Sequence, residues 1–353
     1  MLMVSLLLMF FRAAVFADDV APFDSFQGPV QSVVEEQAVA VAQADGTSKL
    51  SGRVIRKKSL VAASGHVSEE TSYTESGAFG RKEVFHYNDK NQVTDWSGYD
   101  ASDKILWKYT YGYDQLDRLM EENSYDATGA LEAQDKYVYD GTTPAVLSKT
   151  TFDEKGEKKS VYTYFYDAAK RPIGWQTQYA DGTVHKKNVK EYDAEGKLKQ
   201  EYSMNASGTV FERITYSSQA DKSSSRVSSY DDAGKLRDET VSLRDQYGNV
   251  VEESHFLADG SLDWKNVYDY HYDDHQNWIQ KSSTQENQQF GKVVTQLVAV
   301  TYRTIAYTAA SPPPAPPAEA QPTAAPSTPS PASNGDQAAS GTPAPQAADP
   351  AKK

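Results

Sequence analysis

The sequence predicts an all-β protein, an antiparallel meander of tandem β-hairpin repeats with a disordered C-terminal tail. Three observations predict this fold class: a short motif recurs through residues 51–310, the segments between its copies alternate polar with apolar or aromatic residues, and most prolines lie after residue 310. Short strands separated by regular turns are typical of meander sheets. The spacing leaves three arrangements open, namely an open twisted sheet, a solenoid and a partial barrel.

The first residues have the pattern of a secretory signal peptide. An apolar run covers residues 2–11, and small residues precede a cleavage position between Ala17 and Asp18. A run of about ten apolar residues is shorter than the roughly 20 that a membrane-spanning helix needs. We therefore expect residues 1–17 to be a signal peptide of an exported protein, periplasmic or at the cell surface, without a membrane span.

Two further segments flank the repeats. Residues 18–50 are predicted to be an N-terminal leader segment, in which residues 33–42 have the composition of a short helix without a clean apolar stripe. Residues 311–353 hold twelve of the sixteen prolines and no aromatic residue. Such a composition cannot bury enough apolar surface to offset the entropy of ordering, so we expect a disordered Pro/Ala-rich tail.

The repeated motif is an aromatic residue followed by Asp, with Gly three residues after the Asp and an apolar residue soon after. Asp favours an Asx turn, and Gly supplies the positive φ that the turn needs. Successive copies begin 12 to 16 residues apart, which leaves room for one short strand and one turn. The clearest copies contain Tyr125, Asp126 and Gly129; Tyr192, Asp193 and Gly196; and Tyr230, Asp231 and Gly234.

The segments between the turns alternate strictly, as in residues 160–166 and 268–272, which places their tyrosines on one face of a sheet. Only Pro144 and Pro172 fall inside the repeats, as a hydrogen-bonded sheet requires. Residues 293–307 alternate without a Tyr-Asp turn. We expect them to form a capping strand that covers an exposed edge of the sheet.

The motif copies resemble the YD repeats of the Rhs family, which occurs in bacterial polymorphic toxins, toxin-complex shells and extracellular teneurins. The resemblance covers most of residues 84–280 and implies a small exported bacterial member with a β-repeat fold. In large members a spiral of such strands encloses a toxin, and the chain ends in a self-cleaving core and a toxin domain. Neither is visible here, and about fifteen short strands are too few for a large closed shell.

Several classes of chemistry are excluded or disfavoured. The chain has no cysteine, and it lacks a Gly-rich phosphate loop, a Gly-x-Ser-x-Gly motif and a His-Glu-x-x-His motif. We read His271 and His275 as surface residues, and we read acidic pairs such as Asp231 and Asp232 as turn formers rather than calcium ligands. The net charge of −13 argues against nucleic-acid binding. We therefore expect no enzyme activity, no cofactor and no metal.

The aromatic residues carry the functional hypothesis, because the chain has 23 Tyr, 12 Phe and 5 Trp. The Tyr of each motif is predicted to belong to a packing ladder. The tryptophans fall outside that position and are the candidate ligand-binding residues: Trp96, Trp107, Trp175, Trp264 and Trp278. We expect a non-catalytic protein that binds a polysaccharide or a surface protein at the cell envelope. The alternatives are a purely structural scaffold and a truncated Rhs-type shell component associated with a toxin.

Overall fold

The computed structural model describes residues 26–44, 47–219, 222–289 and 292–308, and their regular structure is entirely β-strand. The chain divides into two compact units, Met1–Thr308 and Ala309–Lys353, and all described residues belong to the first. The predicted signal peptide, 1–17, and the predicted tail, 311–353, lie outside the described residues. None of the described residues forms a helix that is long and apolar enough to cross a membrane.

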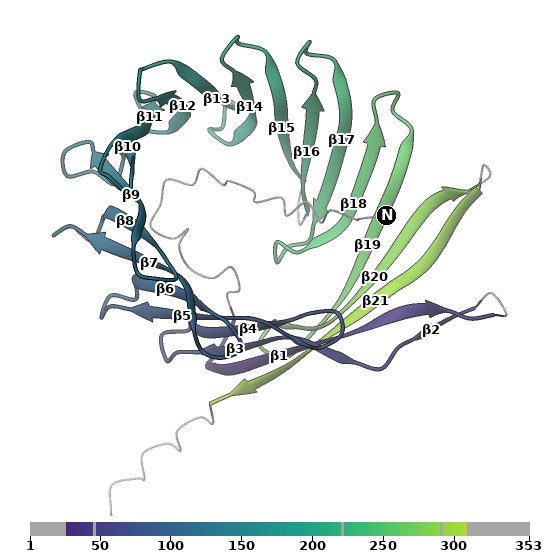
Figure 1. Cartoon of the computed structure of the whole chain (residues 1–353). Coiled ribbons are helices and arrows are strands. Elements are labelled where there is room, and N and C mark those ends of the chain that lie inside the picture. Colours follow the sequence, from purple (N-terminus) through teal and green to yellow (C-terminus); the bar gives the residue numbers. More distant parts are fainter. Residues whose placement is uncertain (1–25, 45–46, 220–221, 290–291, 309–353) are drawn as a thin grey trace, which may run out of the picture. The chain divides into compact units, whose positions relative to one another are not determined.

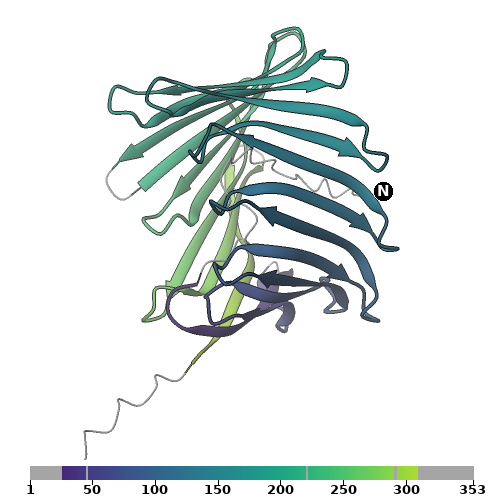
Figure 2. The same cartoon turned by 90° about the vertical axis from the view of Figure 1, so that its left-hand side faces the viewer.

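The described residues form twenty-one strands, most of them seven to eleven residues long. From the third strand onward, each strand pairs antiparallel with the next one along the chain (Figure 2). The strands are β1 (Val30–Ala42), β2 (Ser48–Leu50), β3 (Val54–Val61), β4 (Val67–Tyr73), β5 (Phe79–Tyr87), β6 (Val93–Tyr99), β7 (Ile105–Tyr113), β8 (Leu119–Asp126), β9 (Leu131–Tyr139), β10 (Val146–Asp153), β11 (Lys158–Tyr166), β12 (Pro172–Tyr179), β13 (Val184–Tyr192), β14 (Leu198–Asn205), β15 (Val210–Gln219), β16 (Lys222–Tyr230), β17 (Leu236–Arg244), β18 (Val250–Leu257), β19 (Leu262–Tyr272), β20 (Trp278–Gln289) and β21 (Lys292–Tyr307).

The sheet closes on itself, which corrects the predicted arrangement. Strands β3 to β21 pair in sequence order, and β1 pairs with β3 on one side and with β21 on the other (Figure 1). The result is a closed antiparallel barrel of 20 strands, so the expectation of an open sheet, a solenoid or a partial barrel was wrong. A closed sheet leaves no unpaired edge along its length, whereas an open sheet of this size exposes two.

The closure uses two segments that the sequence analysis had placed differently. Residues 30–42, within the predicted leader segment and overlapping its predicted helix, form β1, whose Glu35 lies opposite both Lys57 and Arg303. Residues 293–307 lie in β21, which has a neighbour on each side over most of its length instead of capping an edge. Charge pairing supports this position, because Glu35 Oε1 lies 3.2 Å from Lys57 Nζ and 3.5 Å from Arg303.

Asp side chains organise the turns. Asp126 Oδ1 accepts hydrogen bonds from the backbone N–H groups of Thr128 and Ala130, at 2.8 and 2.9 Å, which are the contacts of an Asx turn. Gly129 has a φ of 83° in this turn. The same pair of bonds recurs at Asp100, Asp114, Asp153, Asp167, Asp231, Asp245 and Asp273.

Tyrosine hydroxyls tie neighbouring strands together. The hydroxyl of Tyr113, at the end of β7, donates to the carbonyl oxygen of Val93, at the start of the preceding strand β6, at 2.7 Å. Equivalent bonds, each spanning 20 residues, are made by Tyr87, Tyr139, Tyr166, Tyr192 and Tyr270. The compact apolar core beneath them is small and consists of Val93, Tyr111 and Leu119 with their aromatic neighbours.

Candidate functional site: the inner face of the barrel

All five tryptophans lie on one face of the sheet. The strand register carries this face around the ring: Trp96 lies opposite Tyr109, Trp175 opposite Asn188, and Trp264 opposite His255. Trp107 shares the face of Tyr109, two residues away, and Trp278 contacts Tyr270 and Arg303 of the same face. We call the face that carries these tryptophans the inner face.

Burial identifies this face as the inside of the barrel. Side chains on the inside of a closed sheet converge, whereas those on the outside spread apart. Burial raises the pKa of Glu122 and Tyr111 on this face, and it lowers the pKa of Lys281. The other inner-face groups with a pKa raised by burial include Glu83, Tyr137, Tyr164, Glu212 and Tyr268.

The inner face remains accessible because the ring is wide. Side chains fill a barrel of about eight strands, but barrels of about 16 or more leave space that their own side chains do not reach. The exposure of the tryptophans is consistent with such a space, since each of them is only half-buried. The inner face therefore presents aromatic rings together with charged and polar groups.

An aromatic cluster lies across β5, β6 and β7. The ring centroid of Trp96 is 5.7 Å from Phe85 and 5.5 Å from Tyr109, both stacked, and Trp107 approaches its edge at 4.7 Å. Gly98 makes room for Trp107, since a Cβ at that position would come within 2.4 Å of the indole. Trp96 thus has three aromatic neighbours, and its ring serves to pack β5, β6 and β7 together.

Trp175 stands in a more polar environment on β12. Its ring lies 5.8 Å from that of Tyr162, and Asn188 and Thr177 are its inner-face neighbours. Thr177 and Asn188 are both buried, and among the described residues Thr177 Oγ1 and Asn188 Oδ1 have no hydrogen-bond partner. A buried polar atom without a partner costs about 1–3 kcal/mol, so such atoms are rare in folded proteins; Trp96 Nε1 on the same face is another.

A charged group lies next to this polar patch, on β13 and β14. Lys190 Nζ donates to Glu201 at 2.7 Å, and Tyr216 donates to the same carboxylate. Burial alone would raise the pKa of Glu201, but these hydrogen bonds lower it below its usual value. The carboxylate is therefore ionised and held in place, with Asn188 Nδ2 3.4 Å away.

The remaining two tryptophans lie near the closure of the ring. Trp264 stacks on His255, with ring centroids 5.4 Å apart and planes 5° from parallel. Trp278 has the guanidinium of Arg303 3.6 Å above its ring, a cation–π contact. The five candidates thus share a face but form separate groups around it.

The polar partners of Trp175 were missed in the sequence. Thr177 follows Trp175 by two residues, so strand alternation alone would have placed it on the same face. To place Asn188 and Glu201 on this face, the register of two further hairpins must be known. Each of these hairpins contains a one-residue irregularity that shifts its register. The irregularity recurs beside the last strand residue before the turn, as at Tyr113 and Tyr192, so the turn motif marks its position.

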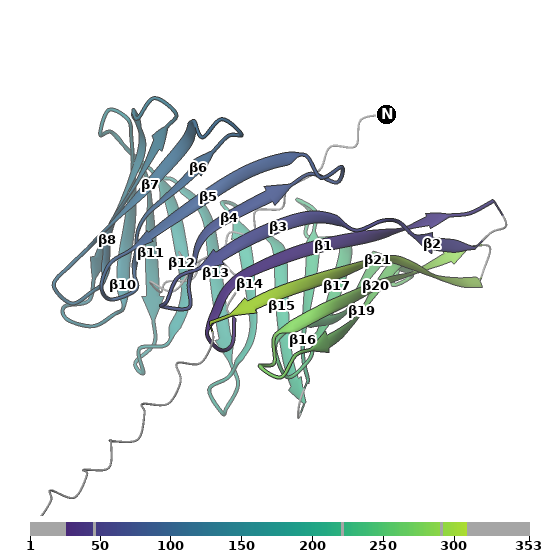
Figure 3. The ribbon, with the colours of Figure 1, turned by 90° about the horizontal axis from the view of Figure 1, so that it is seen from below.

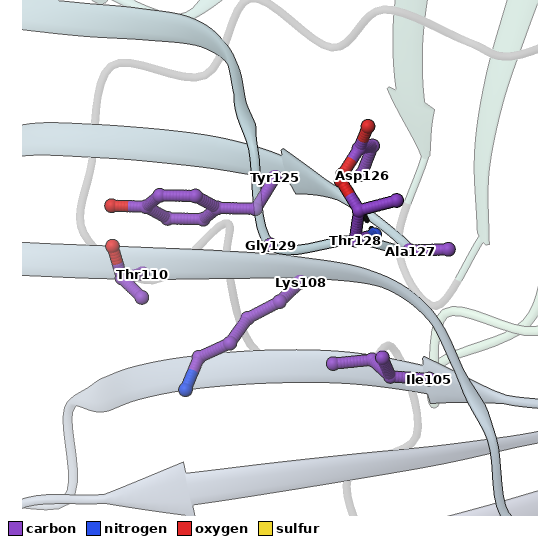
Figure 4. Close-up of a pocket in the computed structure, with 8 residues that line it drawn as sticks. All are labelled: Ile105, Lys108, Thr110, Tyr125, Asp126, Ala127, Thr128 and Gly129. Carbon is purple, nitrogen blue, oxygen red and sulfur yellow. Dashed lines mark hydrogen bonds between the residues drawn. The ribbon is translucent and has the colours of Figure 1, made fainter.

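The outer face carries an open pocket of about 400 Å³. Its walls are Lys108, Thr110 and Tyr125, with the turn residues 126–129 at one end (Figure 4). Lys108 also faces Asp95 at 3.5 Å. The predicted turn residues Tyr125, Asp126 and Gly129 therefore line this pocket, and none of the tryptophans does.

Comparisons with known proteins give only distant likenesses. No protein-family model and no curated protein matches the chain. Among solved structures, a porin-like protein from Bacteroides uniformis is similar with a TM-score of 0.35 and 11% identity, over 79% of this chain and 98% of that one. The Tc holotoxin pore of Photorhabdus luminescens has a TM-score of 0.20 and 10% identity, over 72% of this chain. A complex of TcdB2, TccC3 and Cdc42 has a TM-score of 0.19 and 11% identity, over 79% of this chain.

This chain covers 18% and 21% of the two toxin chains that it matches. The TM-scores are too low for any function to be carried over from these proteins. They leave membership of the YD-repeat family as a resemblance of sequence motifs.

Proposed function

We propose that the chain is a non-catalytic, exported binding protein whose inner face recognises an extended carbohydrate. The observation that carries the proposal is the gathering of all five tryptophans, each of them half-buried, on the inner face. Aromatic rings pack against the C–H faces of sugars, and hydroxyl and amide groups bind sugar hydroxyls. The motif resemblance to YD repeats and the composition of residues 1–17 support an extracytoplasmic setting.

Trp175 and the charged pair beside it form the best-equipped part of this surface, since Trp175 is half-buried whereas Thr177 and Asn188 are buried. The ionised Glu201 and its partner Lys190 extend the polar surface along β13 and β14. A neutral or weakly charged polysaccharide suits this mixture better than a polyanion, because the chain is acidic overall.

The experiment is a glycan array and a peptidoglycan pull-down with the mature chain, followed by titration of any ligand found. We expect Trp175→Ala and Trp264→Ala each to weaken binding by about tenfold, the equivalent of about 1.4 kcal/mol. The matched control is Phe165→Ala, which removes an exposed aromatic ring from the outer face of β11 and should leave binding unchanged. Binding to no glycan, or equal losses in all three variants, would refute the proposal.

A further inference from the structure

Among the described residues, the hydrogen bonding around the ring is interrupted where two hairpins separate. Strand β1 pairs with β21 as far as Val39, which lies opposite Ala299, and then pairs with β2 through residues 40–42. Strand β21 continues to Lys292 and pairs there with β20. The ends of the β1–β2 and β20–β21 hairpins diverge in Figure 1, and both project from the ring in Figure 3.

Exposure changes abruptly at this point. Residues 293–298 are all exposed, whereas Ala299 and Val300 are each only 5% exposed. The exposed side chains are mainly apolar: Val293 is 58% exposed, Val294 38%, Leu297 36% and Val298 42%. Within the described part of the chain, this stretch pairs with β20 on one side and with no strand on the other.

The composition of this stretch is unusual for a free edge. Edge strands are usually protected by charges, by proline or by a covering segment, because their free N–H and C=O groups recruit other strands. Residues 293–302 contain no charged residue and no proline. The stretch is already extended and rich in β-branched residues, so a new strand could add to it without further ordering of β21.

We propose that this edge pairs with the same edge of a second copy of the chain, in a two-fold symmetric dimer joined through β21. The segment is uncharged, so two copies meet without repulsion, and both present exposed apolar side chains. The chain's own C-terminal segment is a poor occupant, because twelve of its residues are prolines without an N–H donor. This proposal is independent of carbohydrate binding.

Symmetry restricts the register. In an antiparallel pair, hydrogen-bonded and non-hydrogen-bonded residue pairs alternate, so a two-fold axis must pass midway between a residue and its own copy in the partner. The centre of residues 293–298 is Thr295 or Gln296. Cα atoms of directly opposed residues lie about 4.5–5.5 Å apart, within the range that a disulfide spans.

Because the chain has no cysteine, single-cysteine variants test the register directly. We expect Thr295→Cys or Gln296→Cys to form a covalent dimer on mild oxidation of the full chain. The control Val138→Cys, which is 52% exposed on the outer face, should remain monomeric under the same conditions. In parallel, sedimentation velocity should show a concentration-dependent dimer that the double variant Val294→Lys, Leu297→Lys abolishes without changing the circular dichroism spectrum.

Three results would overturn the proposal. One is a monomer at all concentrations with no cross-link at either central position. Another is open-ended polymer in place of a dimer, which would mean a non-symmetric contact. The third is cross-linking of Val138→Cys as efficient as that of the two edge variants, which would mean random collision.

Discussion

At the scale of single residues, the backbone of each turn is decided by the residue three positions after its first Asp or Asn. That position has a positive φ in most of the turns, usually with Gly; the turn at Asp140 departs from this, with the positive φ at Gly141. Asp117, Lys170 and Gln276 occupy it with φ of 63°, 61° and 67°. The Gly of the motif therefore lowers the cost of a conformation that the hairpin geometry imposes, and other residues adopt it at some expense.

Gly129 is a suitable position to measure the free-energy cost of a positive φ, because nothing lies within 4 Å of a Cβ built there and a side chain would meet no clash. Gly129→Val should destabilise the protein by about 1–2 kcal/mol through backbone strain alone. The neighbouring Ala130→Val should change stability by less than about 0.5 kcal/mol, since Ala130 is exposed and has no positive φ. Urea unfolding of both variants measures the difference, and equal midpoints would show that the turn does not need a positive φ.

At the scale of elements, the unit of the sheet is a pair of strands. The tyrosine that ends each of several strands donates to a backbone carbonyl at the start of the preceding strand, so it helps to fix the register of these two neighbours. The turn motif and the alternation made the antiparallel hairpins predictable from the sequence. The tyrosine hydroxyl bonds were not predictable, because their partners are backbone atoms that carry no sequence signal.

Removing one of these hydroxyls tests its contribution. Tyr113→Phe leaves the ring in place and deprives the Val93 carbonyl of its donor, so it should cost about 1 kcal/mol. Tyr125→Phe, on the outer face, is the matched control and should be nearly neutral. Thermal melts followed by circular dichroism compare the two. An unchanged melt for Tyr113→Phe would show that water replaces the bond freely.

The same tyrosines make the fold sensitive to alkali. Burial raises the pKa of Tyr87, Tyr113 and Tyr139 to about 12, above the value of about 10 in an unfolded chain. A raised tyrosine pKa favours the protonated folded state, so its contribution to stability is complete below about pH 10 and is lost as the pH rises through about 12. Unfolding should therefore accompany tyrosinate formation in this interval. Titration at pH 10 with the fold intact would contradict the burial of these hydroxyls.

At the scale of the whole barrel, closure was the feature that the sequence did not reveal. Residues 30–42 carry no turn motif, and their Glu, Gln and Ala residues favour a helix in isolation. They become a strand because β3 and β21 offer them two edges, one of which lies more than 200 positions away in the chain. A contact of that separation leaves no local pattern, so tertiary pairing overrides local propensity.

The inner face depends on this closure, since an open sheet would leave the tryptophans on an ordinary exposed surface. The five tryptophans were identifiable as candidates by type, and their common face follows from the register. That they form distinct groups around the face could be seen only in the structure. The same holds for the unpartnered atoms Thr177 Oγ1 and Asn188 Oδ1.

The most direct test of the account is to cross-link β1 to β21. Gln37 lies opposite Thr301, 264 positions along the chain, and the protein has no other cysteine to interfere. In Gln37→Cys, Thr301→Cys a short thiol-reactive cross-linker should join the two positions within one molecule and raise the melting temperature. The control Gln37→Cys, Ser242→Cys should not react internally, because Ser242 lies on β17. An internal link in the first variant is the predicted result, and the absence of one, or links only between molecules, would contradict a closed barrel.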